Sequence, residues 1–320
     1  MKPKVAFYWC ASCGGCEETV VDLGESLLDV TAAVDVVLWP AALDYRYEDV
    51  IALPDGAIAA CFINGAIRTS EQEEIARLLR RKSNTVIAFG ACAAHGGVPA
   101  LANLTTREAI LDAAYHHSPT VVNPDGVEPG PHARFEGHAV PLPEFHTTVR
   151  RLEDVVTVDY VIPGCPPTPA LLADAVGALL EGRLPPAGTV LAPDEALCAS
   201  CARNDTKPDD LRIDRIRRVT ELSVDPDRCF LAQGVLCMGP ATRDGCGETC
   251  IGGNMPCTGC FGPTSGSRDQ GGKMVASLGT LLRDATEESL AGLVDPAGTL
   301  YRYGMAASLL GAARDGEENA

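Results

Sequence analysis

Residues 5–16 have the sequence VAFYWCASCGGC, in which a short apolar run ends at cysteine and glycine. The apolar run at 5–9 predicts a strand. Further apolar runs at 34–39, 57–63, 85–89 and 155–162 are continuous rather than alternating, as expected for strands that are covered on both faces. Segments of helical periodicity separate these runs. Strands that alternate with helices predict a doubly wound, parallel α/β sheet over residues 1–185.

The segments between the strands predict the helices. Apolar residues at helical spacing mark 17–34, 107–115 and 169–180. A further helix is expected to begin at Ser70, where a serine is followed three residues later by a glutamate. Residues 119–143 are rich in proline, glycine and histidine and predict a loop.

The pattern changes near Pro185 and Pro186. Residues 198–260 contain eight of the fourteen cysteines, many glycines and prolines, and little periodicity. A segment of this composition needs an inorganic centre to organise it, because it cannot build a conventional core. We therefore expect two domains, at 1–185 and 186–320, with a helix at 274–282 in the second. The last twenty or so residues are polar, and we expect them to be less ordered.

Composition narrows the function. The chain has 26 Lys and Arg against 43 Asp and Glu, a net charge of −17, which argues against a nucleic-acid surface. Apolar residues make up 46% of the chain, so it is not a disordered protein, and no apolar run reaches the 18 residues that a membrane span needs. The first residues carry no signal-peptide pattern, and we expect a cytoplasmic protein. Since disulfides are rare there, fourteen cysteines indicate metal binding or redox chemistry.

Four cysteines of the first region follow predicted strands. Cys13 and Cys16 follow the run at 5–9, Cys92 follows 85–89, and Cys165 follows 155–162. The carboxyl ends of parallel strands meet at one edge of the sheet, where such sheets bind their ligands. Four thiolates converging among glycines predict a 4Fe–4S cluster. A zinc site is the alternative, although structural zinc usually joins short knuckles.

The second region supplies two further quartets. We group them by contiguity, although spacing alone does not exclude an exchanged partition: Cys198, Cys201, Cys229 and Cys237, then Cys246, Cys250, Cys257 and Cys260. Two zinc ribbons are the alternative, but a ribbon expects two matched Cys-x-x-Cys knuckles for each metal. Cys10 and Cys61 remain, and we expect neither to be a ligand, since Cys61 lies inside an apolar strand. His95, three residues after Cys92, is expected to be a polar loop residue, with a hydrogen bond near the first group as the alternative.

Several motifs resemble the small subunit of NiFe hydrogenases, in particular the cytoplasmic, methyl-viologen-reducing type that associates with heterodisulfide reductase. The resemblance rests on residues 9–16 (WCASCGGC), 90–99 (GACAAHGGVP) and 163–167 (PGCPP). It extends through residues 236–242 (LCMGPAT), 255–263 (MPCTGCFGP) and 269–274 (DQGGKM) and covers almost the whole chain.

The resemblance implies a flavodoxin-like domain followed by a smaller, irregular iron–sulfur domain. It also implies three 4Fe–4S clusters. The proximal one would be bound by Cys13, Cys16, Cys92 and Cys165, the medial one by Cys246, Cys250, Cys257 and Cys260, and the distal one by Cys198, Cys201, Cys229 and Cys237. The chain would relay electrons between H₂ chemistry on a partner large subunit, which holds the nickel, and a downstream iron–sulfur or flavin carrier such as heterodisulfide reductase.

Two details of the resemblance leave alternatives open. Glu18 matches a glutamate used in proton relay, but an acid in the first turn of a helix is equally well explained by the helix dipole. Many relatives have Glu-Gly where this chain has Asn64-Gly65. Because every nickel ligand would lie on another chain, the alternative function is an electron-transfer subunit of a related complex whose large subunit lacks nickel. A zinc-stabilised interaction protein is the third possibility.

Overall fold

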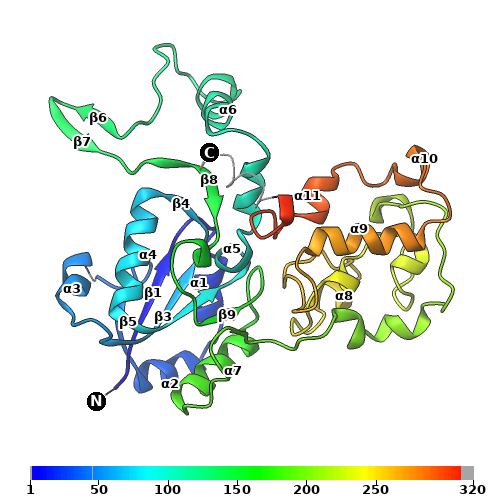
Figure 1. Cartoon of the computed structure of the whole chain (residues 1–320), viewed down its shortest axis with the longest axis horizontal. Helices are drawn as coiled ribbons and strands as arrows, with labels where there is room; N and C mark the ends of the chain where they lie inside the picture. Colours follow the sequence, from blue (N-terminus) through cyan, green and yellow to red (C-terminus); the bar gives the residue numbers. More distant parts are fainter. Residues whose placement is uncertain (1, 45, 311–320) are drawn as a thin grey trace.

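A six-stranded parallel sheet forms the centre of the first half of the molecule. A computed structural model describes residues 2–44 and 46–310 of the chain. The strand order is β10-β9-β5-β3-β1-β2, and every neighbouring pair is parallel (Figure 1). The bounds are β1 Lys4–Trp9, β2 Asp35–Leu38, β3 Ile58–Asn64, β5 Ser83–Phe89, β9 Tyr160–Ile162 and β10 Thr189–Val190. Counted along the chain, this is the flavodoxin order 2-1-3-4-5 with one strand added, which confirms the predicted doubly wound sheet.

Helices cover both faces of the sheet. Successive residues of β1 point to opposite faces, so Val5 and Phe7 belong to one buried cluster and Ala6 and Tyr8 to another. The first cluster is covered by α1 (Gly15–Val21), α2 (Ser26–Ala33) and α7 (Pro169–Leu180). The second is covered by α3 (Tyr47–Ala52), α4 (Ser70–Lys82) and α5 (Ala91–His95). This double covering explains the continuous apolar runs in the sequence.

Three predicted elements differ in their bounds. The helix predicted at 17–34 is two helices, because the chain turns between α1 and α2 through Gly24, whose φ is +59°. The strand predicted at 155–162 is confined to β9. Its first apolar residues, Val155 and Val156, follow a 3₁₀ turn and fill the core without entering the sheet. The helix predicted at 107–115 is α6 (Arg107–Asp112) followed by a π-helical turn.

The segment predicted as a loop contains a hairpin. β6 (His132–Phe135) and β7 (His138–Pro141) pair through a two-residue turn in which Glu136 and Gly137 both have positive φ. Such a turn matches the twist of antiparallel strands. A residue followed by glycine between two short strands could therefore have indicated this hairpin in the sequence. A second two-stranded sheet pairs β4 (Ile67–Thr69) with β8 (Phe145–Arg150).

Two helix starts are set by side-chain caps. The helix predicted to begin at Ser70 is capped by Thr69, whose hydroxyl accepts from the Gln72 N–H while Gln72 bonds back to Thr69. α9 (Gln270–Leu281) begins four residues earlier than predicted, because the Asp269 carboxylate accepts from the Gly272 N–H. Both are ordinary N-caps, placed one or more residues before the periodic apolar stripe.

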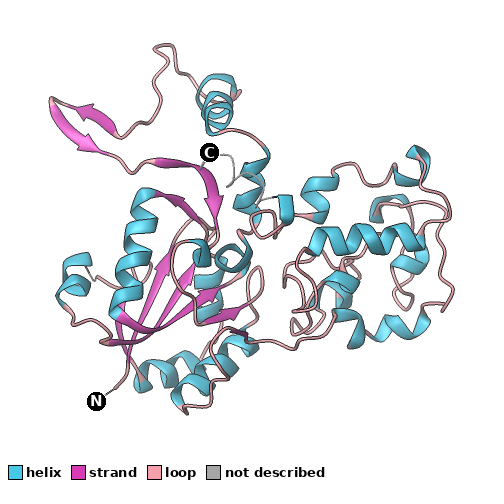
Figure 2. Cartoon of the chain, viewed as in Figure 1, coloured by secondary structure: helices cyan, strands magenta, loops and turns pink. Residues whose placement is uncertain are grey.

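The second half of the chain forms a separate lobe of short helices and loops (Figure 2). Besides α9 it contains α8 (Thr249–Gly252), α10 (Glu287–Leu290) and α11 (Pro296–Leu300), and no strand follows β10 in the described residues. Its core gathers apolar side chains around Met274 and Leu278 of α9. β10 lies just beyond the predicted boundary at 185/186, and the division into two domains remains a prediction. Part of the polar C-terminal segment, 311–320, lies outside the described residues.

None of the helices in the described ranges is both long enough and apolar enough to cross a lipid bilayer.

Candidate functional site

Four cysteines lie where three strands end at the carboxyl edge of the sheet. The chain leaves β1 and passes Cys13 before Cys16 enters α1, Cys92 is the second residue of α5 after β5, and Cys165 follows β9. Burial raises the pKa of the Cys16 thiol, and the thiols of Cys92, Cys165 and Cys13 raise it further. The structure therefore brings the first predicted group within electrostatic range.

Glycines make room for these sulfurs. A Cβ atom on Gly90 would lie 2.3 Å from the Cys16 Sγ, and one on Gly97 would lie 2.4 Å from the Cys92 Sγ. Both glycines also have positive φ, +88° and +60°. The backbone N–H of Val98 donates to the Cys92 sulfur and lowers its pKa against the larger effect of burial. At this edge the backbone therefore approaches the thiols so closely that any side chain at position 90 or 97 would collide with them.

The second group lies in the other lobe. Burial, followed by the neighbouring Cys237 thiol, raises the pKa of Cys198 to about 12. Cys229 and Cys201 contribute smaller effects of the same sign. A Cβ on Gly239 would stand 3.2 Å from the Cys198 Sγ and 3.6 Å from the Cys237 Sγ, so a glycine again faces the sulfurs.

The third group is built around Cys260. Burial raises the pKa of its thiol to about 12, and Cys246 and Cys250 raise it further. Cys257 interacts with Cys260 and receives a hydrogen bond at its sulfur from the Gly259 N–H. Cys250 lies in α8 and is exposed. The thiol of Cys237, from the second group, affects the pKa of Cys257 more than Cys260 does, so these effects leave the contiguous grouping a prediction.

The three groups form a row. Cys165 of the first group raises the pKa of Cys260, and the Cys165 N–H donates to the Cys260 sulfur. Cys237 of the second group raises the pKa of Cys257, and the Cys257 N–H donates to the Cys237 sulfur. The third group therefore lies between the other two, joined to each by one thiol pair.

We define these groups by the effects of their thiols on one another's pKa, because the side chains are not arranged as ligands around a single metal ion. Within residues 2–44 and 46–310, no three His, Cys, Asp or Glu side chains converge closely enough to hold one metal ion.

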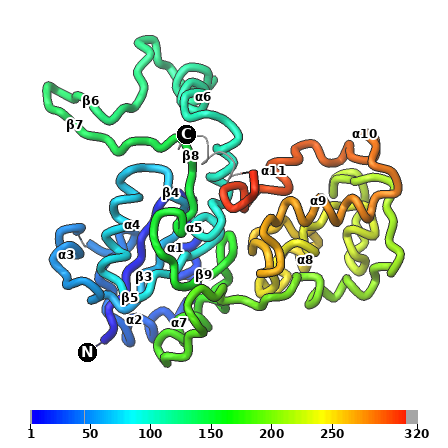
Figure 3. Tube along the Cα trace, in the orientation of Figure 1, coloured from blue at the N-terminus to red at the C-terminus, as the bar shows by residue number. Residues whose placement is uncertain are grey.

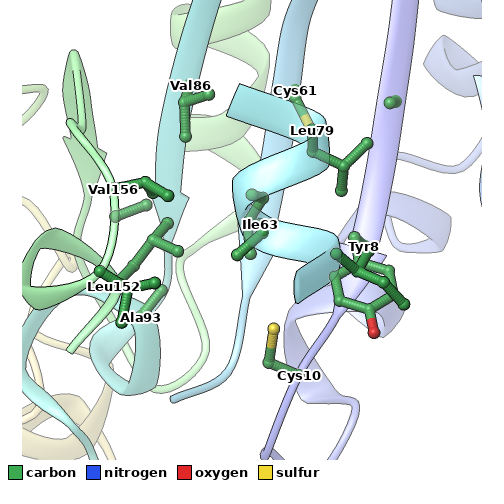
Figure 4. Close-up of a cluster of buried hydrophobic side chains, with 14 of the residues drawn as sticks. Tyr8, Cys10, Cys61, Ile63, Leu79, Val86, Ala93, Leu152 and Val156 are labelled. Atoms are coloured by element: carbon green, nitrogen blue, oxygen red, sulfur yellow. The ribbon is translucent and has the colours of Figure 1, made fainter. Parts of the chain in front are cut away.

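Cys10 and Cys61 belong to the sheet core instead (Figure 4). Both are buried in the cluster that contains Ile63 and Leu79, with Cys61 fully inaccessible to solvent. Burial raises the pKa of the Cys61 thiol to about 12. The structure places both cysteines apart from the three groups, as small apolar residues would be placed.

Glu18, the acid singled out from the sequence, is exposed, whereas its neighbour Glu17 is buried beside the first group. The Trp39 indole N–H donates to one Glu17 oxygen, and the Asn64 amide donates to the other at 2.6 Å. Burial raises the pKa of Glu17, and these two hydrogen bonds oppose the rise. The sequence did contain one indication that an acid here is buried: Trp39 and Asn64 each end an apolar run at the same sheet edge as Cys16.

His95 lies between the first and third groups. A Cβ on Gly262 would be 2.2 Å from its Nε2, so the imidazole packs directly on the backbone two residues after Cys260. Burial lowers the pKa of His95 to about 4, with smaller contributions from Arg151 and Arg243. A neutral imidazole therefore fills the space between the two cysteine groups near neutral pH.

Comparisons with known proteins place this arrangement in a family. Residues 13–179 match the family described as "NADH ubiquinone oxidoreductase, 20 Kd subunit". The iron–sulfur subunit of the F420-non-reducing hydrogenase of Archaeoglobus profundus is 36% identical over 97% of this chain and 98% of its own length. A subunit of the F420-non-reducing hydrogenase of Methanothermobacter thermautotrophicus is 34% identical over 97% of this chain and 96% of its own length.

A solved structure supports the fold alone. The recombinant NiFeSe hydrogenase from Desulfovibrio vulgaris Hildenborough aligns with a TM-score of 0.54 at 17% identity, over 85% of this chain and 96% of the matched chain.

Proposed function

This chain belongs to the small-subunit family of NiFe-type hydrogenases, and from that premise we propose that it relays electrons between a partner large subunit and a further redox protein. The observation that carries the proposal is the row of three cysteine quartets that begins at the carboxyl edge of the sheet. The described residues offer this row, and the nickel ligands would lie on the partner large subunit. Its contribution to hydrogen chemistry is to position redox centres.

Three 4Fe–4S clusters fit the three quartets. Cys13, Cys16, Cys92 and Cys165 would bind the proximal cluster, Cys246, Cys250, Cys257 and Cys260 the medial one, and Cys198, Cys201, Cys229 and Cys237 the distal one. The fit rests on the donor set, four thiols in each group, and on the glycines that leave space at Cys16, Cys92 and Cys198. The clusters supply one-electron transfer, and their potentials depend on hydrogen bonds to sulfur, charge and burial.

The residues of this chain would set those properties. The N–H groups of Val98, Gly239 and Gly259 donate to cysteine sulfurs, one in each quartet. Hydrogen bonds of this kind stabilise negative charge on sulfur. The His95 imidazole packs on the backbone at Gly262, two residues after Cys260, and so lies between the proximal and medial sites. Burial raises the pKa of the thiols of Cys16, Cys92 and Cys165, so binding of a positively charged centre there must release protons.

The proximal edge would face the large subunit. Apolar side chains near it are exposed, with Trp9 at 43%, Val98 at 47% and Leu104 at 49% of their full accessibility. Exposed apolar residues gathered at a functional edge mark a protein interface. The electrons would leave at the other end of the row, near Cys198 and Cys229, toward an iron–sulfur or flavin carrier such as heterodisulfide reductase.

A cytoplasmic location is part of this proposal. Every cysteine is a free thiol in the structure, which suits a reducing compartment. The competing function, an electron-transfer subunit whose large partner lacks nickel, differs in the partner and not in this chain.

The experiment that tests the cluster assignment is metal and sulfide analysis of the protein purified without oxygen. We expect about twelve iron atoms and twelve acid-labile sulfides carried by each chain, and essentially no zinc, because each 4Fe–4S cluster takes four thiolates. About four sulfides together with about two zinc ions would contradict the assignment and mean that both C-terminal quartets bind zinc.

A further inference from the structure

An arginine-rich segment crosses the surface of the second lobe. Residues 211–219 have the sequence LRIDRIRRV. Leu211, Ile213 and Ile216 are buried, whereas Arg212, Arg215, Arg217 and Arg218 are exposed. The apolar residues anchor the segment, and the arginines between them are held at the surface.

The backbone of this segment is fixed by its neighbours. The Ile213 N–H donates to the Leu281 carbonyl at 2.9 Å and the Ile216 N–H to the Ser289 carbonyl at 2.7 Å. On the opposite side, the Arg217 N–H donates to the Gly234 carbonyl at 2.7 Å. A Cβ on Gly292 would lie 2.4 Å from the Ile216 carbonyl oxygen, so the packing admits only glycine there. The backbone that carries the arginines is therefore held in place by these contacts.

Two adjoining hollows share Arg217. One, of about 250 Å³, has an apolar floor that includes Val235, Leu236 and Met238, with Arg217, Arg218 and Arg302 at its rim. The other, of about 520 Å³, is lined by Arg212, Arg215, Arg217 and Arg228. We call these six arginines together the arginine surface. An apolar pocket with a charged rim is the usual anatomy of a protein-docking site.

The charge of the arginine surface is opposite to that of the chain as a whole, which is −17. Two acidic residues, Asp214 and Asp225, line the larger hollow, and Asp214 is paired with Arg283 at 2.9 Å. Within the described residues, no ion pair involves Arg215, Arg217 or Arg218. Their charges are thus available to a partner.

The arginine surface lies next to the distal end of the cysteine row. Arg228 and Ala232 line the larger hollow and lie on the loop that carries Cys229. Cys257 lines the smaller one. The Gln233 side chain donates to the Arg228 carbonyl at 3.0 Å and so fixes this loop beside the hollow. The segment lies in the lobe away from the six-stranded sheet (Figure 3), and so away from the proximal edge.

We infer that the arginine surface docks an acidic redox protein, which exchanges electrons with the quartet Cys198, Cys201, Cys229 and Cys237. This inference rests on the proposed relay and specifies the partner's chemistry: a protein with a carboxylate-rich face and one apolar side chain for the smaller hollow. Opposite charges would steer such a partner to the electron exit, whereas the rest of this acidic chain would repel it.

The test uses the complete complex with its large subunit and measures H₂-dependent reduction of three acceptors. The acceptors are a bacterial-type ferredoxin of strong negative charge, cytochrome c of positive charge, and methyl viologen. The variant is Arg215→Glu with Arg218→Glu. The control carries the same charge change elsewhere, Lys2→Glu with Arg183→Glu, since both residues are exposed and lie outside the arginine surface.

In the Arg215→Glu, Arg218→Glu variant we expect kcat/KM for the ferredoxin to fall at least tenfold, while the rates with cytochrome c and methyl viologen do not fall. Raising the salt concentration from about 0.05 to 0.5 M should slow ferredoxin reduction by the unmodified complex, because salt screens exposed charges. Equal ferredoxin kinetics in variant and control, salt-independent reduction, or no ferredoxin reduction by a complex that reduces methyl viologen would overturn the inference. A complex that reduces no acceptor with H₂ would instead contradict the proposed relay.

Discussion

Replacing Gly90 with alanine is expected to abolish the proximal cluster while leaving the second lobe intact. The new Cβ would stand 2.3 Å from the Cys16 Sγ, well inside van der Waals contact, and φ at this position is +88°. Strain of this kind costs about 1–3 kcal/mol even without a collision. Because Cys16 must move, we expect acid-labile sulfide to fall from about twelve to about eight per chain. Loss of the first centre should also abolish H₂-dependent reduction of the other two.

The matched control is Gly177→Ala in α7. A Cβ there meets no atom within 4 Å, and alanine in a helix interior is favoured over glycine by about 0.5–1 kcal/mol. The control should retain full sulfide content and full reduction by H₂. If the Gly90→Ala protein has the sulfide content of the control, the thiols beside Gly90 do not bind a cluster.

The second large effect is expected at Cys250. In Cys250→Pro the medial cluster loses one of its four thiolates, so we expect it to lose one iron and become a 3Fe–4S cluster of higher potential, since cluster type and charge set the potential. Cys250 is the second residue of α8 and lies in its first turn. The N–H groups of a first turn have no partner within the helix, so proline removes no helix hydrogen bond there. The fold and reduction of the proximal cluster by H₂ should remain, while transfer to a low-potential acceptor should slow.

Electron paramagnetic resonance of the oxidised variant measures this change. A strong new 3Fe–4S signal is expected in Cys250→Pro and also in the control Cys250→Ala, which removes the thiol without proline's constraint on the backbone. An unchanged 4Fe–4S spectrum with full acceptor activity in both variants would contradict ligation by Cys250.

The sheet and its edge could be predicted from the sequence because the signals are local. Continuous apolar runs mark strands covered on both faces, and cysteines directly after them must meet at the carboxyl edge. Two bounds were wrong, for different reasons. The residues before β9 are apolar because they fill the core from a turn, and the apparent single helix at 17–34 is interrupted at Gly24.

The candidate site was harder to predict beyond its thiols. Spacing indicated two contiguous C-terminal quartets, but the row emerges from contacts between residues distant in sequence, such as the hydrogen bond from the Cys165 N–H to the Cys260 sulfur. The burial of Glu17, which the sequence did not single out, shows the same limit. Which of two adjacent acids is buried depends on Trp39 and Asn64, which are distant in sequence.

The most direct test of the relay is to expose the complete anaerobic complex to H₂ and follow the iron–sulfur centres of this chain. Reduction should bleach their visible absorption and produce paramagnetic resonance signals from all three clusters, and an added acceptor should reverse both changes. Abundant clusters that H₂ leaves oxidised, although dithionite reduces them, would contradict the account. That result would favour a complex whose large subunit lacks nickel.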